Sequence, residues 1–228
     1  MALARKYCAI VKHIEHPLPD VYVVTFASDE ERFRFKPGQF LHLALDPYDP
    51  SRQWPESRCF SVQTNPDEDD LKITYSVKGV YTKRMSSELQ VGKTIWLKLP
   101  YGELFQKPHS KEHCVFIAGG TGITPYLSLF TDASFRAYSS PTLYFGYRSD
   151  DYNIYSQQLQ KAMQNNSSLL VKCTVEENEG FLKIENILDE NHAAQTFFIS
   201  GPPQMIRLFK KHLLLHVDVS KVMTDEWE

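Results

Sequence analysis

A glycine-rich segment in the middle of the chain has the residue types that bind a phosphate. It reads Ala-Gly-Gly-Thr-Gly-Ile-Thr-Pro over residues 118–125, between an apolar run and a helical pattern. Glycines allow a tight turn and a close approach of a diphosphate, and the N-terminus of the following helix offers free N–H groups. Pro125 suits the first turn of that helix. A tight structural turn is the alternative explanation of the same glycines.

A second candidate anion site is the segment Arg58-Cys59-Phe60-Ser61. An arginine can bind a diphosphate through two parallel N–H groups. On a strand, Phe60 would share a face with Arg58, whereas Ser61 would point to the other face. Taken alone, the segment is better interpreted as an ordinary strand with a surface arginine and a core phenylalanine.

Two further segments end a strand and begin a helix. In the first, Gly79 ends a strand and Thr82 begins a helix, whose exposed N–H groups favour a phosphate. A simple helix cap on Thr82 is the alternative. In the second, Ser200-Gly201-Pro202 follows a strand and precedes an amphipathic helix. Because the carboxyl ends of strands line the ligand crevice of open α/β sheets, this turn is a candidate part of a binding site.

The elements that would position these segments change in character near residue 107. Before it, short segments rich in β-branched and aromatic residues alternate with turns, which predicts an antiparallel β-barrel or sandwich. After a polar linker at 108–112, strands alternate with helices, which predicts a parallel sheet with crossover helices. We expect strands at 22–26, 40–45, 71–77, 94–99, 114–118, 142–147, 169–175 and 196–200, and helices at 125–130, 155–165 and 204–216. The chain should therefore form two domains, 1–107 and 112–228.

Composition and charge argue against several classes of protein. The 228 residues are 42% hydrophobic and 23% charged, as in globular proteins, and a net charge of −3 gives no general attraction to nucleic acid or anionic lipid. The longest apolar runs are strand-sized and residues 1–12 lack a secretory pattern, so we expect no membrane span and a cytoplasmic protein. The four cysteines form neither a CxxC pair nor a closely spaced set, so we expect neither disulfides nor an iron–sulfur cluster.

Two histidine pairs have spacings that could hold a metal. They are His109 with His113, and His212 with His216, which stand four residues apart on an expected helix. Neither pair comes with two further matched ligands. Surface or packing histidines are the better interpretation, and we expect no metal.

The four motifs, taken in chain order, resemble the ferredoxin–NADP reductase superfamily, including the reductase modules of oxygenases and flavohaemoglobins. The motifs are Arg58-x-Phe60-Ser61, Gly79-x-x-Thr82, Gly119-Gly120-Thr121-Gly122-x-x-Pro125 and Gly201-Pro202-Pro203-x-Met205. The resemblance covers essentially the whole chain. It implies a β-barrel domain that binds FAD and an α/β domain that binds NADH or NADPH.

The resemblance implies a role for each motif residue of the first domain. Arg58 would bind the FAD diphosphate, Phe60 would lie against the isoalloxazine ring, and Ser61 would hydrogen-bond near flavin N5, where the hydride lands. The other residues of this implied FAD site are Cys59, Ser76, Val77, Lys78, Gly79 and Thr82.

In the second domain the resemblance implies a nicotinamide dinucleotide site. Its glycine-rich part would be Gly119, Gly120, Thr121 and Gly122, and Gly201 and Pro202 would lie beside the nicotinamide. Ser200 stands where the family usually has cysteine, and it could still touch the nicotinamide.

The last residues fit the same resemblance. Trp227 would cover the flavin ring and move aside for the nicotinamide, and Asp225 would stabilise charge there. A surface tail is the alternative. The candidate catalytic residues are thus Ser61, Ser200, Asp225 and Trp227.

Charged residues after two strands bear on the choice of nicotinamide. Glu176 and Glu177 follow the expected strand 169–175, where NADPH enzymes of the family commonly carry a Ser-Arg pair. Carboxylates would repel a 2′-phosphate and could accept hydrogen bonds from a free ribose hydroxyl. Arg148, after the preceding strand, could reach a 2′-phosphate, the diphosphate or solvent. We expect NADH to be preferred.

The implied activity is transfer of a hydride from NAD(P)H to FAD and of electrons onward to a separate acceptor. Because the chain has no cluster-binding cysteines, that acceptor would be a ferredoxin, a flavodoxin or an oxygenase component. One alternative is a reductase that releases reduced flavin, and another is an electron-transfer subunit that needs a second chain. We expect a monomer.

Overall fold

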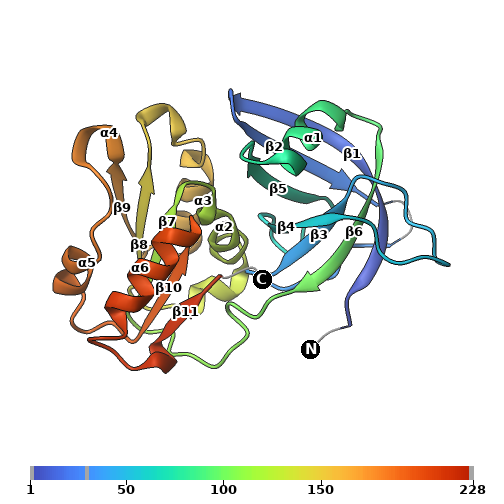
Figure 1. Ribbon diagram of the computed structural model, residues 1–228. Helices are drawn as coiled ribbons and strands as arrows, with labels where there is room; N and C mark the ends of the chain where they lie inside the picture. The colour runs from blue at the N-terminus through green and yellow to red at the C-terminus, as the bar shows by residue number, and fades with distance from the viewer. Residues whose placement is uncertain (1–2, 29–30, 226–228) are drawn as a thin grey trace. The chain divides into compact units, whose positions relative to one another are not determined.

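The computed structural model describes residues 3–28 and 31–225, and the chain divides into two compact units, Met1–Gly102 and Glu103–Glu228 (Figure 1). The division lies five residues before the predicted residue 107. The reason is that Leu104 is buried in the core of the second unit and Phe105 packs against the same core. The predicted linker, 108–112, therefore belongs to the second unit.

The first unit is a six-stranded antiparallel sheet in the order β4-β3-β6-β1-β2-β5. Leu41 and Leu43 are fully buried and alternate with partly exposed neighbours, which is the period-two pattern of a strand with one face in the core. The end strands β4 and β5 contact each other, so the sheet curls into a barrel. The elements are β1 (Arg5–Leu18), β2 (Val21–Ala27), β3 (Phe40–Ala44), β4 (Ser57–Ser61), β5 (Leu71–Ser76), α1 (Val80–Glu88) and β6 (Thr94–Tyr101).

The second unit is a five-stranded parallel sheet in the order β11-β10-β7-β8-β9. Phe116 and Phe198 pack with α2 and α3 on one face, whereas Ile117 and Phe197 pack with α5 and α6 on the other. The strands are β7 (Cys114–Gly119), β8 (Thr142–Tyr147), β9 (Leu170–Val175), β10 (Thr196–Ser200) and β11 (Val222–Thr224). The helices are α2 (Thr124–Phe130), α3 (Ser156–Asn165), α4 (Glu176–Glu179), α5 (Ile184–Glu190) and α6 (Pro203–Leu213). The predicted fold class, an antiparallel barrel followed by a parallel α/β domain, is confirmed.

Some elements differ from the prediction. β1, β11 and α5 were not predicted, and α6 ends at Leu213 rather than at residue 216. β1 does not show throughout the alternation of apolar and polar residues that predicts a strand. The reason is that its pairing register with β2 shifts twice, between Val11 and His13 and between Glu15 and Leu18. Tyr7, Ala9 and Val11 are buried in alternation, but no residue of β1 after Val11 is buried, so the period-two pattern does not continue past the first shift.

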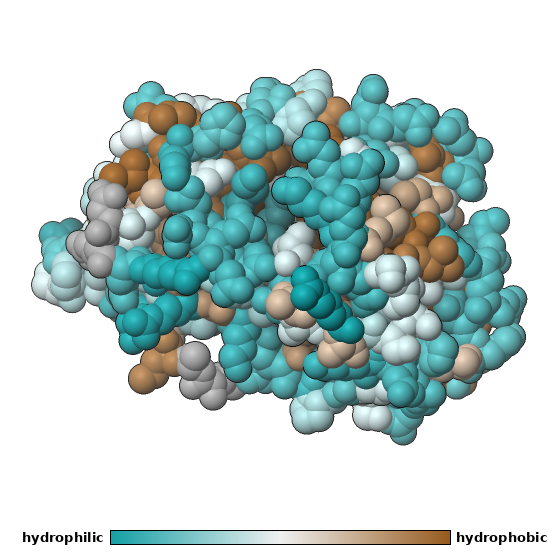
Figure 2. Space-filling view, turned by 180° about the vertical axis from the view of Figure 1, so that it is seen from behind, coloured by the Kyte–Doolittle hydropathy of each residue, from teal (hydrophilic) through white to brown (hydrophobic). Residues whose placement is uncertain are grey.

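The face shown in Figure 2 is mainly hydrophilic, with apolar residues in small patches. Every helix in the described part of the chain is too short or too polar to cross a membrane. Among the large apolar side chains, Phe181 is 74% exposed. Its place after α4 makes it relevant to the sheet edge described below.

Tyr75 of β5 has a buried hydroxyl that makes no hydrogen bond with any residue in the described ranges. The side chain is 3% exposed, and its ring stacks on Tyr22 with 5.3 Å between ring centroids. Burial raises the pKa of this phenol further above its ordinary value, so the group stays neutral. A buried polar group without a partner lowers stability.

Replacing Tyr75 with phenylalanine should therefore raise the free energy of unfolding by about 1 kcal/mol. Tyr81→Phe is the matched control, because the Tyr81 hydroxyl donates to the carbonyl oxygen of Leu43 at 2.7 Å and accepts from the Leu45 N–H at 3.2 Å. That control should lose stability in the same denaturant titration. Equal destabilisation by both substitutions would mean that Tyr75 has a hydrogen-bond partner after all.

Candidate functional site

All five strands of the second unit end at the same edge of the parallel sheet. The residues at or just after these ends are Gly119, Arg148, Glu176, Gly201 and Asp225. The strand order reverses between β7 and β10, which is where open α/β sheets bind dinucleotides. The structure thus brings the sequence-predicted dinucleotide residues to one edge.

The turns after β7 and β10 pack directly on each other. A Cβ on Gly122 would lie 2.5 Å from the backbone nitrogen of Gly201, and one on Gly119 would lie 2.9 Å from both Met205 Sδ and Pro202 Cδ. Gly201 has φ of 150° and leaves no space for a side chain either, because a Cβ there would lie 2.7 Å from Met205 Cε. These glycines are therefore required by packing within the protein.

Gly120 differs from its neighbours. Its φ is 54°, in the left-handed region, and no atom lies within 4 Å of where its Cβ would be. A helical turn, residues Gly120–Ile123, begins here and runs directly into α2, so helical structure starts five residues before the predicted 125. The tight-turn explanation accounts for Gly119 and Gly122, whereas Gly120 leaves the backbone open to a ligand.

Ser200 and Asp225 meet at the ends of β10 and β11. The Ser200 hydroxyl donates to Asp225 Oδ2 at 3.3 Å, and the Asp225 N–H donates to the carbonyl oxygen of Ile199 at 3.0 Å. Both side chains are buried, at 2% and 6% exposure. Complete burial raises the pKa of nearby Tyr126, and the charge of Asp225 raises it further. Two of the predicted catalytic residues are thus in contact, while Trp227 lies outside the described residues.

The two segments predicted to decide between NADH and NADPH also lie close together. The Glu177 N–H donates to the backbone oxygen of Arg148 at 3.0 Å, which joins the turns after β8 and β9. Arg148, Glu176 and Glu177 are exposed. Phe181 follows Gly180, whose φ is 77°, and was missed by the sequence reasoning. The signal that could have found it is an aromatic directly after a glycine at the end of an acidic turn.

In the first unit, Arg58 lies beside the start of α1. Its guanidinium carbon is 4.9 Å from the centroid of the Tyr81 ring, so the motifs at 58–61 and 79–82 are in contact. Nη1 donates to the backbone oxygen of Ser57 at 2.8 Å, and Nη2 donates to Glu56 Oε1 at 2.9 Å. The Arg58 side chain is 51% exposed. A cation and a helix N-terminus therefore adjoin on one surface, as an anion requires.

The start of α1 corrects the prediction for Thr82. The helix begins at Val80 with Gly79 as its N-cap, so Thr82 is its third residue. The Thr82 hydroxyl accepts hydrogen bonds from the N–H groups of Lys78 at 2.9 Å and Gly79 at 3.0 Å, which is why it does not itself begin the helix. The first-turn N–H groups remain without intrahelical partners. No atom lies within 4 Å of where a Gly79 Cβ would be, so the space beside this N-cap is open.

The other predicted flavin residues divide between the two faces of their strands. Phe60 packs near Tyr75, with 6.0 Å between ring centroids, whereas the Cys59 side chain points to the opposite face, with Sγ 3.5 Å from Nε2 of His42. Ser61 is buried and Ser76 pairs with Val21. The Val77 N–H donates to the backbone oxygen of Asp20. The N–H groups of Val77 and Lys78 are thus both engaged within the protein.

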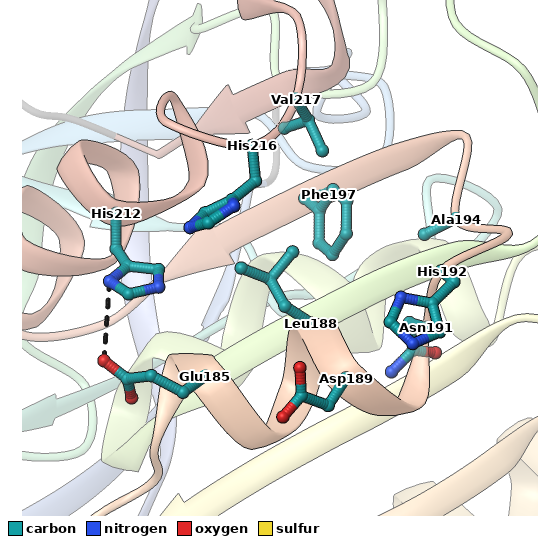
Figure 3. Close-up of a pocket in the computed structure, with 10 residues that line it drawn as sticks. All are labelled: Glu185, Leu188, Asp189, Asn191, His192, Ala194, Phe197, His212, His216 and Val217. Atoms are coloured by element: carbon teal, nitrogen blue, oxygen red, sulfur yellow. Dashed lines mark ion pairs between the residues drawn. The ribbon is translucent and has the colours of Figure 1, made fainter.

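A pocket of about 550 Å³ between α5 and α6 contains the histidine pair that sequence analysis set aside (Figure 3). His212 pairs with Glu185 at 3.4 Å, and its ring centroid is 5.1 Å from that of His216. The pocket adjoins Phe197 at the amino end of β10, the end opposite Gly201. In the ranges 3–28 and 31–225, no group of three histidine, cysteine or carboxylate side chains could hold a metal ion.

Several known proteins are similar to this chain in sequence or in fold. Residues 116–211 match the family model described as the oxidoreductase NAD-binding domain. A ferredoxin NADP+ reductase from Neisseria gonorrhoeae, solved with bound FAD and NADP, superimposes with a TM-score of 0.78 over 99% of both chains, at 19% identity. The fold is that of the ferredoxin–NADP reductases. The resemblance drawn from the motifs is confirmed.

Curated relatives match the chain in sequence as well. Methane monooxygenase component C of Methylosinus trichosporium is 29% identical over 149 residues, which is 64% of this chain and 42% of that protein. The NAD(P)H-flavin reductase of Aliivibrio fischeri is 27% identical over 171 residues, 70% of this chain and 69% of that protein. The chain spans between 30% and 42% of the length of the four curated relatives it matches first.

The packing of the two glycine turns can be tested without any ligand. Gly122→Ala should destabilise the chain by about 3 kcal/mol or more, because its methyl group would overlap the backbone of Gly201. Gly120→Ala should cost only about 1–2 kcal/mol, the price of a left-handed backbone in open space. Thermal unfolding of both variants measures the difference. A Gly120 variant less stable than the Gly122 variant would contradict this assignment.

Proposed function

We propose that the chain is a flavoprotein reductase that transfers a hydride from NAD(P)H to FAD and passes electrons to a separate acceptor. The observation that carries the proposal is the approach of Arg58 to the start of α1, because it forms an anion site on the barrel. The ferredoxin–NADP reductase fold supports the assignment of that anion to a flavin diphosphate.

The residues present fit FAD. Arg58 and the first-turn N–H groups of α1 would hold the diphosphate, and the bare backbone at Gly79 gives access to it. Phe60 would lie against the ring, with Ser61 and the carbonyl oxygens of 76–78 at its edge. When bound, FAD accepts the two electrons of a hydride together and can release them singly.

The edge of the second unit fits a nicotinamide dinucleotide. Gly120 and Thr121 would receive the diphosphate, and Gly201 and Pro202 would lie beside the nicotinamide. Asp225 holds the Ser200 hydroxyl by a buried hydrogen bond, so it would fix the orientation of Ser200 toward the ring. Trp227 stays a prediction for the flavin face.

Donor choice is proposed to favour NADH. Glu176 and Glu177 place two exposed carboxylates after β9, and these disfavour a 2′-phosphate more than the single Arg148 favours it. The exposed ring of Phe181 would stack on the adenine.

The proposed partner is a separate ferredoxin, flavodoxin or oxygenase component. Relatives named as components of larger systems support this assignment. We further propose that the chain is a monomer and that it lies in the cytoplasm. Two alternatives each have a relative in their favour: release of reduced flavin, as in the named flavin reductase, and a subunit role, as in a named electron transfer subunit.

Loss of Arg58 tests the flavin site. Arg58→Ala should weaken FAD binding by about 2–3 kcal/mol, because a charge-assisted contact to the diphosphate is removed. Arg5→Ala is the control, since Arg5 is an exposed cation of the same unit paired with Glu31. Flavin content after purification and FAD titration both report the change. Equal FAD affinity in the Arg58 variant and the wild type would remove the basis of the proposal.

Steady-state kinetics with NADH and NADPH and an artificial acceptor test donor choice. The wild type should have the higher kcat/KM with NADH. The double change Glu176→Gln with Glu177→Gln should improve NADPH by roughly tenfold, since two repelling charges are removed at about 1.4 kcal/mol in total. A wild-type preference for NADPH that disappears in Arg148→Ala would show that Arg148 sets the choice instead.

A further inference from the structure

We propose that Glu56 competes with the flavin diphosphate for Arg58 and thereby lowers the affinity of the chain for its flavin. The inference deepens the proposed function and rests on it, because FAD is the ligand concerned. It gives a role to an acid that precedes the first flavin motif and that the motif itself does not include.

The guanidinium of Arg58 already donates to a backbone oxygen and to a carboxylate. Bidentate binding of a phosphate uses two parallel N–H groups of the arginine fork. Here Nη2 donates to Glu56 Oε1 at 2.9 Å and Nη1 donates to the backbone oxygen of Ser57 at 2.8 Å. A diphosphate bound by the same two groups would compete with the Glu56 carboxylate for Nη2.

The backbone keeps Glu56 close to Arg58 after its carboxylate is displaced. Glu56 is only two residues from Arg58 in the chain, and its backbone oxygen lies 3.3 Å from the hydroxyl of Tyr81, whose ring lies under the Arg58 guanidinium. The released carboxylate therefore remains near the diphosphate as a like charge. Displacement and repulsion act in the same direction, and both weaken flavin binding.

The arginine of α1 itself is engaged by two acids. Arg84, on α1, is bound by Asp46 and Glu88. These ion pairs hold the pKa of both carboxyls below their usual range, so the pairs persist at neutral pH. Arg84 is therefore not available to replace Arg58 at the ligand.

The expected effect is modest because the pair is exposed. The side chains of Arg58 and Glu56 are 51% and 58% exposed, and exposed pairs are screened by solvent and salt. Removal of the Glu56 charge should tighten flavin binding by about two- to fivefold, the range of an exposed ion pair. FAD bound to the wild type should therefore exchange more readily than FAD bound to a variant that lacks the Glu56 charge.

A double-mutant cycle on the full chain, stripped of flavin and titrated with FAD, tests the inference. Glu56→Gln should bind FAD about two- to fivefold more tightly than the wild type at low salt. The same substitution in an Arg58→Ala background should change the affinity by much less. Glu112→Gln, which removes one exposed charge from the second unit, is the control for net charge and should have no effect.

Unchanged or weaker FAD binding by Glu56→Gln would overturn the inference. An equal gain in the Arg58→Ala background would also overturn it, because Glu56 would then act without Arg58. Failure of the wild type to bind FAD at all would instead overturn the proposed function and the inference with it, so the two failures are distinguishable.

Discussion

The close approach of two backbone turns, at Gly122 and Gly201, is the constraint on which the second unit depends. Any side chain at either position would overlap protein atoms, so the ends of β7 and β10 are held directly against each other. Ser200, at the end of β10, is in turn hydrogen-bonded to Asp225 in the interior. Gly120 differs from Gly122 and Gly201, because a Cβ there would meet no atom within 4 Å.

The candidate anion site of the first unit depends on a positive charge rather than on close packing of the backbone. The aromatic ring of Tyr81 lies under Arg58, and its hydroxyl is fixed to the backbone of β3. The cation is thus positioned at a helix start by a buried phenol, although the cation itself stays exposed. Its neighbours Glu56 and Ser57 then set how readily it accepts a ligand.

Much of the architecture could be predicted from the sequence, because the patterns are strong. The strands at 142–147 and 196–200 have the predicted limits, since their apolar runs are bounded by turn residues. β1 could not be predicted, because its register shifts break the alternation. The boundary between the two units lies at residue 102 rather than at the predicted 107, because Leu104 packs into the core of the second unit. The sequence pattern does not show that packing.

The sequence predicted which residues belong to the site, but not which of them face a ligand and which pack within the protein. Sequence indicated four glycine-rich or basic motifs, yet gave no reason to separate Gly120 from Gly119 and Gly122. Only the surroundings of each glycine make that distinction. The helix start at Val80 was likewise hidden, because a threonine at the third helical position looks like a cap in sequence. Contacts such as that between Glu56 and Arg58 depend on side-chain conformation, which no motif encodes.

The most direct test of the central claim is the anaerobic mixing of the FAD-loaded full chain with one equivalent of NADH, observed by visible absorption. The proposed reductase should lose the absorption of its oxidised flavin, with one flavin reduced for each NADH consumed. A flavin that stays oxidised with both NADH and NADPH would contradict the account, whatever the affinity of the chain for either ligand.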